Sequence, residues 1–191
     1  MAITSDVVGR PLTVTNVTAA EVSAVVDPLL REYGEWVADR IKQDAGITFT
    51  EADLARHHDA FRAEIPRLLG SRGLLLVARL DEYPVSVGAL KPIDEVTAEI
   101  KRMFVRPVAQ GLGVGRAILL RLVQDARAEG YATVRLETLQ LMTTACAMYR
   151  AFDFVEIAKF EGSEIANTVL GPLTIAMELD LTAISAVLAE Q

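Results

Sequence analysis

The chain has 191 residues, of which 51% are hydrophobic, and we expect residues 1–191 to form one globular domain with a substantial core. Its net charge of −7 excludes general nucleic-acid binding, because neutralising phosphates requires clustered Lys and Arg. No apolar run reaches the roughly 18 residues of a membrane span, and the N-terminus lacks a basic region followed by an apolar run, so we expect no membrane partner and a cytoplasmic location.

The N-terminal third of the chain predicts a short strand and two helices. Leu12 to Thr15 alternates in polarity, as a strand does. Thr18-Ala19-Ala20-Glu21 then fits a helix capping box, and the first helix should extend to about Trp36. Thr50-Glu51-Ala52-Asp53 is a second helix start, and that helix should end near Leu69.

A block of three strands follows the second helix. Residues 74–80 and 85–90 are apolar runs of strand length that flank a turn-like segment, which predicts a β-hairpin. Residues 96–105 predict a longer third strand. Its alternation breaks at Met103-Phe104-Val105, which indicates a bulge or the end of regular pairing there. Arg106-Pro107 ends the strand, since proline cannot donate to a ladder.

The last third of the chain predicts helices that alternate with strands. Apolar residues from Ile118 to Ala126 recur at helical spacing, and Glu129-Gly130 provides the stop. The remaining expected elements are a strand at 134–138, a helix at 144–152 and strands at 154–158 and 174–179. The chain is therefore a mixed α and β protein without internal repeats or an interdomain linker.

Cysteine and histidine are too sparse for a disulfide or a structural metal site. Cys146 is the only cysteine, so an intramolecular disulfide is excluded, and its place in the helix between two alanines predicts a packed thiol. His57 and His58 are adjacent and lack the thiol partners of a zinc site, so we expect no metal. We expect both histidines to lie at the surface or to be partly packed; the alternative is that one of them contacts an acceptor substrate.

Positive charge is concentrated between residues 101 and 128, although the chain as a whole is acidic. This segment has one acidic residue, Asp125, and six basic residues: Lys101, Arg102, Arg106, Arg116, Arg121 and Arg127. Such an electropositive segment indicates either a small anionic ligand or a solvated helix face.

A glycine-rich loop joins the strand that ends at Val105 to the next helix. Gly111, Gly113 and Gly115 allow close approach of the backbone to a ligand, and the first N–H groups of the helix have no internal partners. Phosphate can accept from them, the helix dipole favours its charge, and Arg116 adds a positive group. The pattern predicts a phosphate site, with a tight turn that binds nothing as the alternative.

Two other phosphate motifs do not fit this loop. The dinucleotide fingerprint G-x-G-x-x-G needs a glycine at Ile118 if it starts at Gly113, and at Arg116 if it starts at Gly111. A P-loop needs Gly-Lys-Ser or Gly-Lys-Thr, which the chain lacks. Dinucleotide binding of the Rossmann type and nucleotide hydrolysis are therefore not expected.

Gln110, Gly113 and Gly115 satisfy the pattern Q/R-x-x-G-x-G/A, and here the chain resembles the GCN5-related N-acetyltransferase (GNAT) superfamily, in a bacterial branch that acts on small substrates. Nearly the whole chain takes part in the resemblance. Its segments are 98–107, 110–116, 136–138 with Met142 and Ala145, 149–154, 30–33 and 177–179. Two departures are Asp153, where relatives usually have glycine, and residues 162–171, which form a different loop. Aspartate tolerates the left-handed conformation that this turn requires.

The resemblance implies a GNAT-like twisted, mixed sheet of six to seven strands that splays after its central strand, flanked by about four helices. The pantetheine arm of acetyl-CoA would lie in the gap, paired with backbone groups of Met103 and Val105, and amides of residues 110–116 would hold the pyrophosphate. The implied donor site comprises Met103, Phe104, Val105, Gln110, Gly111, Leu112, Gly113, Val114, Gly115 and Arg116.

Amide formation needs a neutral amine, a stabilised oxyanion and a proton for the departing thiolate. The resemblance places the phenol of Tyr149 near the sulfur, as general acid, with a core tyrosine as the alternative. Glu99 is the candidate base, directly or through water, or else a strand carboxylate paired with a basic neighbour. Tyr33 and Trp36 are core or pocket wall.

We therefore expect an N-acetyltransferase that moves acetyl from acetyl-CoA to a primary amine of a small molecule or amino acid by direct attack. The alternatives are a non-catalytic acyl-CoA-binding or regulatory module and a protein N-acetyltransferase. A homodimer is an expectation from the family resemblance alone.

Overall fold

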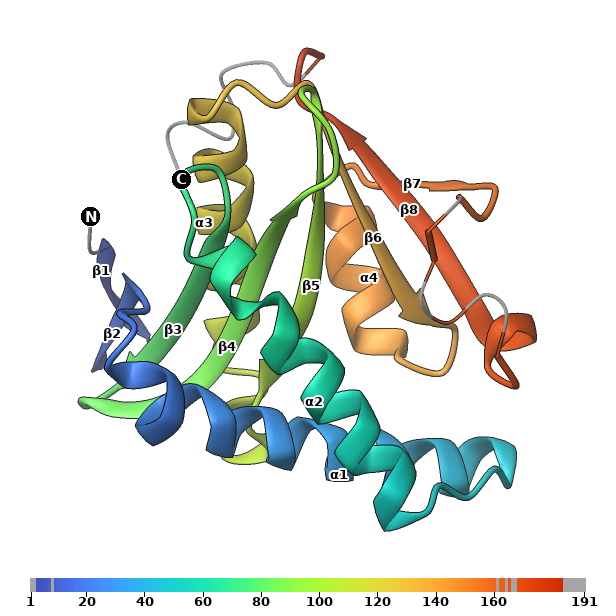
Figure 1. The fold of residues 1–191 in the computed structure, drawn as a ribbon. Helices are drawn as coiled ribbons and strands as arrows, with labels where there is room; N and C mark the ends of the chain where they lie inside the picture. Colours follow the sequence, from blue (N-terminus) through green and yellow to red (C-terminus); the bar gives the residue numbers. More distant parts are fainter. Residues whose placement is uncertain (1–2, 8, 161, 164, 166–167, 184–191) are drawn as a thin grey trace.

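The computed structural model describes residues 3–7, 9–160, 162–163, 165 and 168–183. The described residues form one eight-stranded sheet with four α-helices (Figure 1). The strands are β1 Ile3–Val7, β2 Arg10–Asn16, β3 Leu74–Leu80, β4 Tyr83–Pro92, β5 Thr97–Val105, β6 Thr133–Leu139, β7 Val155–Ile157 and β8 Thr174–Asp180. The helices are α1 Asp27–Ala45, α2 Glu51–Leu68, α3 Val114–Ala128 and α4 Thr143–Ala151. Within this part of the chain, no helix combines the length and apolarity needed to cross a bilayer.

The sheet has the order β1-β2-β3-β4-β5-β6-β8-β7, and its centre is forked. All neighbouring strands are antiparallel except β5 and β6, which are parallel and pair only between residues 97–100 and 133–136. Beyond Ile100 and Leu136 the two strands separate, and Figure 1 shows them diverging. The expected splayed, mixed sheet is confirmed.

The sheet has one strand more than the six to seven that we expected. The additional strand, β1, pairs with β2 across a turn in which the N–H of Gly9 donates to Oδ1 of Asp6 at 2.7 Å. Thr4, Ser5 and Asp6 are all exposed, and Val7 at the end of the strand packs partly buried against the core that includes Ile118. Because three exposed residues follow one another, the alternation of buried and exposed residues that reveals a strand is not visible here.

The first helix differs from its expected bounds at both ends. The backbone N–H and the hydroxyl of Thr18 donate to Oε2 of Glu21, at 2.9 and 2.8 Å, but the Thr18 hydroxyl does not accept from the Glu21 N–H, so only half of the expected capping box forms. A five-residue π-helix, Val22–Val26, follows before α1 begins. The helix passes Trp36 and ends at Ala45, and its C-cap Gly46 has a φ of 68° and donates its N–H to the Lys42 carbonyl. A left-handed glycine is a common helix terminator, and it was a signal available in the sequence.

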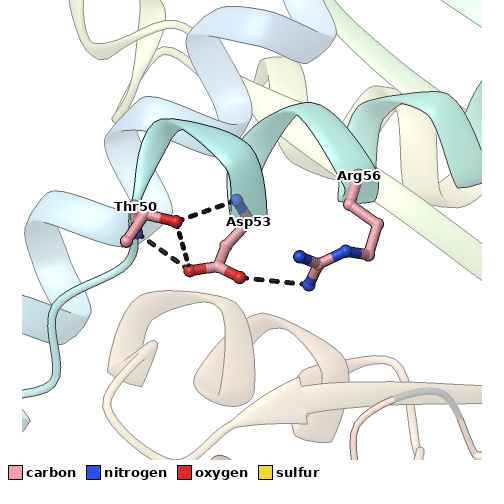
Figure 2. A network of polar contacts seen from close by, with 3 residues as sticks. All are labelled: Thr50, Asp53 and Arg56. Carbon is pink, nitrogen blue, oxygen red and sulfur yellow. Dashed lines mark hydrogen bonds and ion pairs between the residues drawn. The ribbon is translucent and has the colours of Figure 1, made fainter.

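The start of α2 is the capping box that the sequence predicted (Figure 2). The N–H of Asp53 donates to the Thr50 hydroxyl at 3.2 Å, and the N–H of Thr50 donates to Oδ2 of Asp53 at 3.0 Å. Arg56 adds a contact of 3.0 Å from its Nη1 to the other carboxylate oxygen of Asp53. Two backbone donors that the helix itself cannot satisfy therefore have partners.

Replacing the cap should weaken the fold measurably. We expect Thr50→Ala to lower the free energy of unfolding by about 1 kcal/mol, because one N–H of the first turn loses its acceptor. For a chain of this size the melting temperature should fall by about 2–4 °C. Urea and thermal unfolding measure both quantities. Thr48→Ala, at an exposed site before the helix, is the matched control; equal stability of the two variants would contradict the capping role.

Helices cover both faces of the sheet and create two cores. The larger core lies between the sheet and α3 and α4, and includes Ile118, Leu122 and Tyr149. The second lies between the sheet and α1 and α2, where Leu29 and Phe61 are buried. The forked centre of the sheet therefore has helices on both sides (Figure 1).

A bulge distorts β5 just beyond the fork. Val87 pairs with Phe104 and Ala89 with Lys101, so Gly88 of β4 faces two residues, Arg102 and Met103. Arg102 has a φ of 55°. The irregularity expected near Met103 is thus confirmed. A Cβ at Gly88 would lie 2.8 Å from Cγ2 of Ile118, so glycine is needed for α3 to pack there.

Candidate active site

The glycine loop connects the forked strand to an uncapped helix. After β5 ends at Val105, a short 3₁₀ turn, Pro107–Ala109, leads to Gly111 and Gly113, with φ of 76° and 82°. L-residues rarely adopt these values, which explains both glycines. Gly113 is the N-cap of α3, and no side chain accepts from the first N–H groups of the helix. Such groups can donate to an anion, and binding of a phosphate by this loop stays a prediction.

The other residues of the loop link it to its surroundings. The side-chain amide of Gln110 donates to the Val105 carbonyl at 2.9 Å and so ties the loop to the end of β5. Val114 is buried and Leu112 packs against the larger core. Arg116 is exposed, with its guanidinium 5.1 Å from the centre of the Phe152 ring. The loop is therefore anchored by its apolar residues and presents its amides and one arginine.

Beyond Ile100, the edge of β5 that faces β6 has no strand partner among the described residues. Met103 is half-buried and packs against the larger core. The Phe104 side chain is buried in the smaller core, where its ring centre lies 5.6 Å from that of Tyr33 and 6.0 Å from that of Trp36. Both α1 aromatics therefore wall this part of the sheet. Phe104 has a clear packing role, and its contact with a donor stays a prediction.

Tyr149 projects from α4 into the larger core, near the loop and the fork. Its ring lies 5.9 Å from that of Phe154, and its side chain is buried. Burial raises the pKa of the phenol, and proximity to Tyr33 and Cys146 raises this pKa further. Among the described residues the hydroxyl has no hydrogen-bond partner. Tyr149 is therefore a protonated phenol at neutral pH with its proton available.

Glu99 lies on β5 just before the fork, and it is buried. Burial raises the pKa of its carboxyl group, the positive charges of Lys101 and Lys91 oppose this change, and the negative charges of Glu137 and Glu64 add to it. The net effect is a raised pKa. A carboxylate with a raised pKa is a stronger base at neutral pH, which suits the role predicted for it.

Three charged residues near Glu99, namely Glu64, Lys91 and Glu137, were not expected from the sequence, and they lie around it together with Lys101. Glu64 of α2 contacts the ammonium groups of Lys91 and Lys101, the latter at 3.5 Å. Burial is the main reason why the pKa of Lys101 falls to about 8. Glu137, on β6, has a buried carboxylate oxygen with no hydrogen-bond partner in the described part of the chain. These residues come from four elements, so no local spacing in the sequence links them.

The two adjacent histidines have different surroundings. His57 keeps an exposed face. Nevertheless, burial and then the positive charges of Arg102 and Lys101 lower its pKa to about 4. It is therefore neutral at physiological pH and lies near the charged residues at the fork. His58 is mostly buried beside Asp27, at 3.8 Å. In the described residues, no group of three or more metal-binding side chains is positioned to hold an ion.

Two cavities flank these elements, and the smaller one belongs to the candidate site. It measures about 220 Å³ and is lined by Glu99 together with Arg67, Lys91, Ile93, Arg135, Phe160 and Gly162. The larger, of about 370 Å³, lies between the end of α2 and the C-terminal half of α3, and none of the predicted site residues lines it. If Glu99 acts as the base, the acceptor would therefore bind in the smaller cavity.

Comparison with known sequences matches residues 38–154 to the Acetyltransferase (GNAT) family. An IAA acetyltransferase of Azospirillum brasilense is 36% identical over 126 residues, 62% of this chain and 82% of that protein. An uncharacterised N-acetyltransferase of Dictyostelium discoideum is 35% identical over 71 residues, 37% of this chain and 33% of that protein. A third, from Schizosaccharomyces pombe, is 32% identical over 100 residues, 51% of this chain and 61% of that protein. The chain thus covers less than two thirds of the last two relatives.

Solved structures share the fold at low sequence identity. A PaiA N-acetyltransferase of Thermoplasma acidophilum, in complex with coenzyme A, matches with a TM-score of 0.66 and 18% identity, over 88% of this chain and 98% of that one. A Salmonella typhimurium acetyltransferase with its cofactor acetyl-CoA matches with a TM-score of 0.59 and 18% identity, over 92% and 96%. These likenesses establish the architecture.

Proposed function

Because this chain belongs to the Acetyltransferase (GNAT) family, we propose that it transfers an acetyl group from acetyl-CoA to the primary amine of a small molecule or amino acid. One observation carries the proposal most directly. The open edge of β5 leads straight into a glycine loop at the uncapped N-terminus of α3. Acetyl-CoA has an extended pantetheine chain that could lie along this open strand edge, and phosphates that could accept from the amides of the loop. Two structural relatives hold coenzyme A or acetyl-CoA.

In this proposal the donor supplies an acetyl group activated as a thioester, and side chains of the protein act as general base and general acid. Glu99 takes a proton from the incoming ammonium group, so that the neutral amine can attack the carbonyl carbon. Tyr149 donates its phenolic proton to the sulfur as the carbon–sulfur bond breaks. The second proton that the nitrogen loses as the amide forms restores the phenol, and Glu99 releases its proton to solvent. Amides of residues 110–116 and the main chain of Met103 and Val105 would hold the donor. A homodimer is proposed from the family resemblance, and the cytoplasmic location stays an expectation from the sequence.

The activity is tested with acetyl-CoA and a panel of amines, amino acids and peptides. Release of free CoA with acetylation of a small amine is the expected result. Separately, acetyl-CoA at about 100 times its Kd should stabilise the protein by about 2.7 kcal/mol. Stabilisation without turnover would favour the non-catalytic acyl-CoA-binding module, and turnover with peptides alone would favour a protein N-acetyltransferase. The absence of both effects would contradict acetyl-CoA as the ligand.

Replacing Glu99 should change how the rate depends on pH. In the native protein, kcat/KM should rise with pH through the raised pKa of Glu99, since only the carboxylate accepts a proton. We expect Glu99→Gln to lower kcat/KM by roughly 10²- to 10⁴-fold and to remove this limb of the profile. Glu95→Gln, at an exposed position before β5, is the control. A Glu99→Gln variant with an unchanged profile would show that Glu99 is a structural carboxylate.

A further inference from the structure

The wall of the cavity beside Glu99 carries both acidic and basic side chains, and the basic ones outnumber the acidic one among the described residues. Among the described residues of the lining, Glu99 contributes the one carboxylate, and Arg67, Lys91 and Arg135 contribute three cationic groups. Lys91 is occupied by its contact with Glu64. The two arginines therefore decide what else the cavity can bind.

Each arginine retains donors after its contacts within the chain. Arg67 donates from Nη2 to the Pro92 carbonyl, a neutral partner, and forms no ion pair with a described residue. Arg135 donates from Nε to Oε2 of Glu178 at 2.8 Å, and its guanidinium lies 5.5 Å from the centre of the Phe160 ring. Its two terminal amino groups have no partner in the described part of the chain. Arg135 is thus fixed in place with its terminal donors available.

We infer that the acceptor is an amine that also bears a carboxylate, such as a small apolar amino acid; this inference rests on the proposed function. The amine of the acceptor would lie at Glu99, and its carboxylate would bind Arg67 and Arg135. Planar guanidinium groups match a carboxylate in geometry as well as charge. Ile93 and Phe160 provide apolar surface for a short side chain. At about 220 Å³, the cavity is smaller than sites for drug-sized ligands, which limits the acceptor to a small molecule.

The register of the sheet supports this placement. Glu99 pairs with Arg135 across the parallel β5–β6 ladder, so the two side chains lie on the same face. Lys91 pairs with Glu99 on the other side. An acceptor with its amine at Glu99 would therefore reach the Arg135 guanidinium on the adjacent strand. Its amine would lie just before the fork, next to the gap in which the pantetheine arm is expected to lie.

The test compares kcat/KM for the amino acids alanine, valine and leucine with kcat/KM for their carboxamides, using the full chain and acetyl-CoA. The acids should be preferred by roughly tenfold or more, because the carboxylate forms charge-assisted bonds with the arginines. The amines of the carboxamides are less basic than those of the acids, so a larger fraction of them is neutral and reactive at a given pH. This difference favours the carboxamides, so a preference for the acids cannot arise from it. Arg67→Gln and Arg135→Gln should each raise KM for the acids and leave the amides unchanged.

Arg40→Gln, which breaks an exposed ion pair with Asp44 on α1, is the matched control and should change neither series. Arg67 is itself exposed, so Arg67→Gln is expected to fold even if Arg135→Gln does not. Amides that are acetylated as well as the acids would overturn the carboxylate site and leave the proposed acetyltransferase intact. Failure to acetylate any amine in the wider panel would overturn both.

Discussion

Tyr149→Phe should lower kcat by roughly 10²- to 10⁴-fold, because it removes the proton that the departing thiolate needs. The substitution keeps the ring that packs against Phe154 and deletes only the hydroxyl. Burial raises the pKa of this phenol, so the native residue holds its proton at every pH near neutrality. Steady-state rates with a good acceptor, together with the affinity for acetyl-CoA, measure the effect. The affinity should change little.

Stability separates this catalytic role from a packing role. The hydroxyl of Tyr149 has no partner among the described residues, so its removal should leave the free energy of unfolding unchanged or slightly increased. Tyr33→Phe is the matched control, since it makes the same change in the neighbouring tyrosine of α1. A fully active Tyr149→Phe enzyme would remove the general-acid assignment. An equal loss in both variants would indicate a shared effect on packing.

Local sequence patterns were sufficient to predict the backbone of the glycine loop and the elements around it. Gly111 and Gly113 adopt the positive φ values that their residue type suggested. Asp153 occupies the turn where relatives have glycine, with a φ of 64°, as its tolerance of that conformation allowed. Each of these features depends on residues that are neighbours in sequence. The same is true of the capping box at Thr50.

Features that depend on distant partners escaped prediction. β1 pairs with β2 and has three exposed residues in succession, so no periodicity marks it in the sequence. The charges near Glu99 come from α2, β4, β5 and β6, and their pKa values follow from burial that only the folded chain creates. The arginines of the smaller cavity were not singled out for the same reason. The sequence therefore predicted the local backbone of the glycine loop, and it missed the charged residues that the fold gathers around Glu99.

The second large effect that we expect concerns Phe61, which connects α2 to the sheet. Phe61 is buried in the smaller core, and the Arg102 guanidinium lies 5.3 Å from its ring centre. Phe61→Ala should lower the free energy of unfolding by about 3–5 kcal/mol, because it removes buried apolar surface and leaves a cavity. Urea unfolding measures this loss. Val108→Ala, at an exposed valine, should change stability by less than about 0.5 kcal/mol.

The position of Phe61 also predicts a selective effect on activity. The same helix carries Glu64, which contacts two lysines beside Glu99, and Arg67, which lines the smaller cavity. A loosened α2 should therefore raise KM for the acceptor more than KM for acetyl-CoA, whose proposed loop is held by α3. Phe61→Leu retains more of the buried surface and should show a smaller change in both stability and acceptor KM. Loss of stability with an unchanged acceptor KM in the folded variant would contradict the assignment of α2 to the acceptor side of the site.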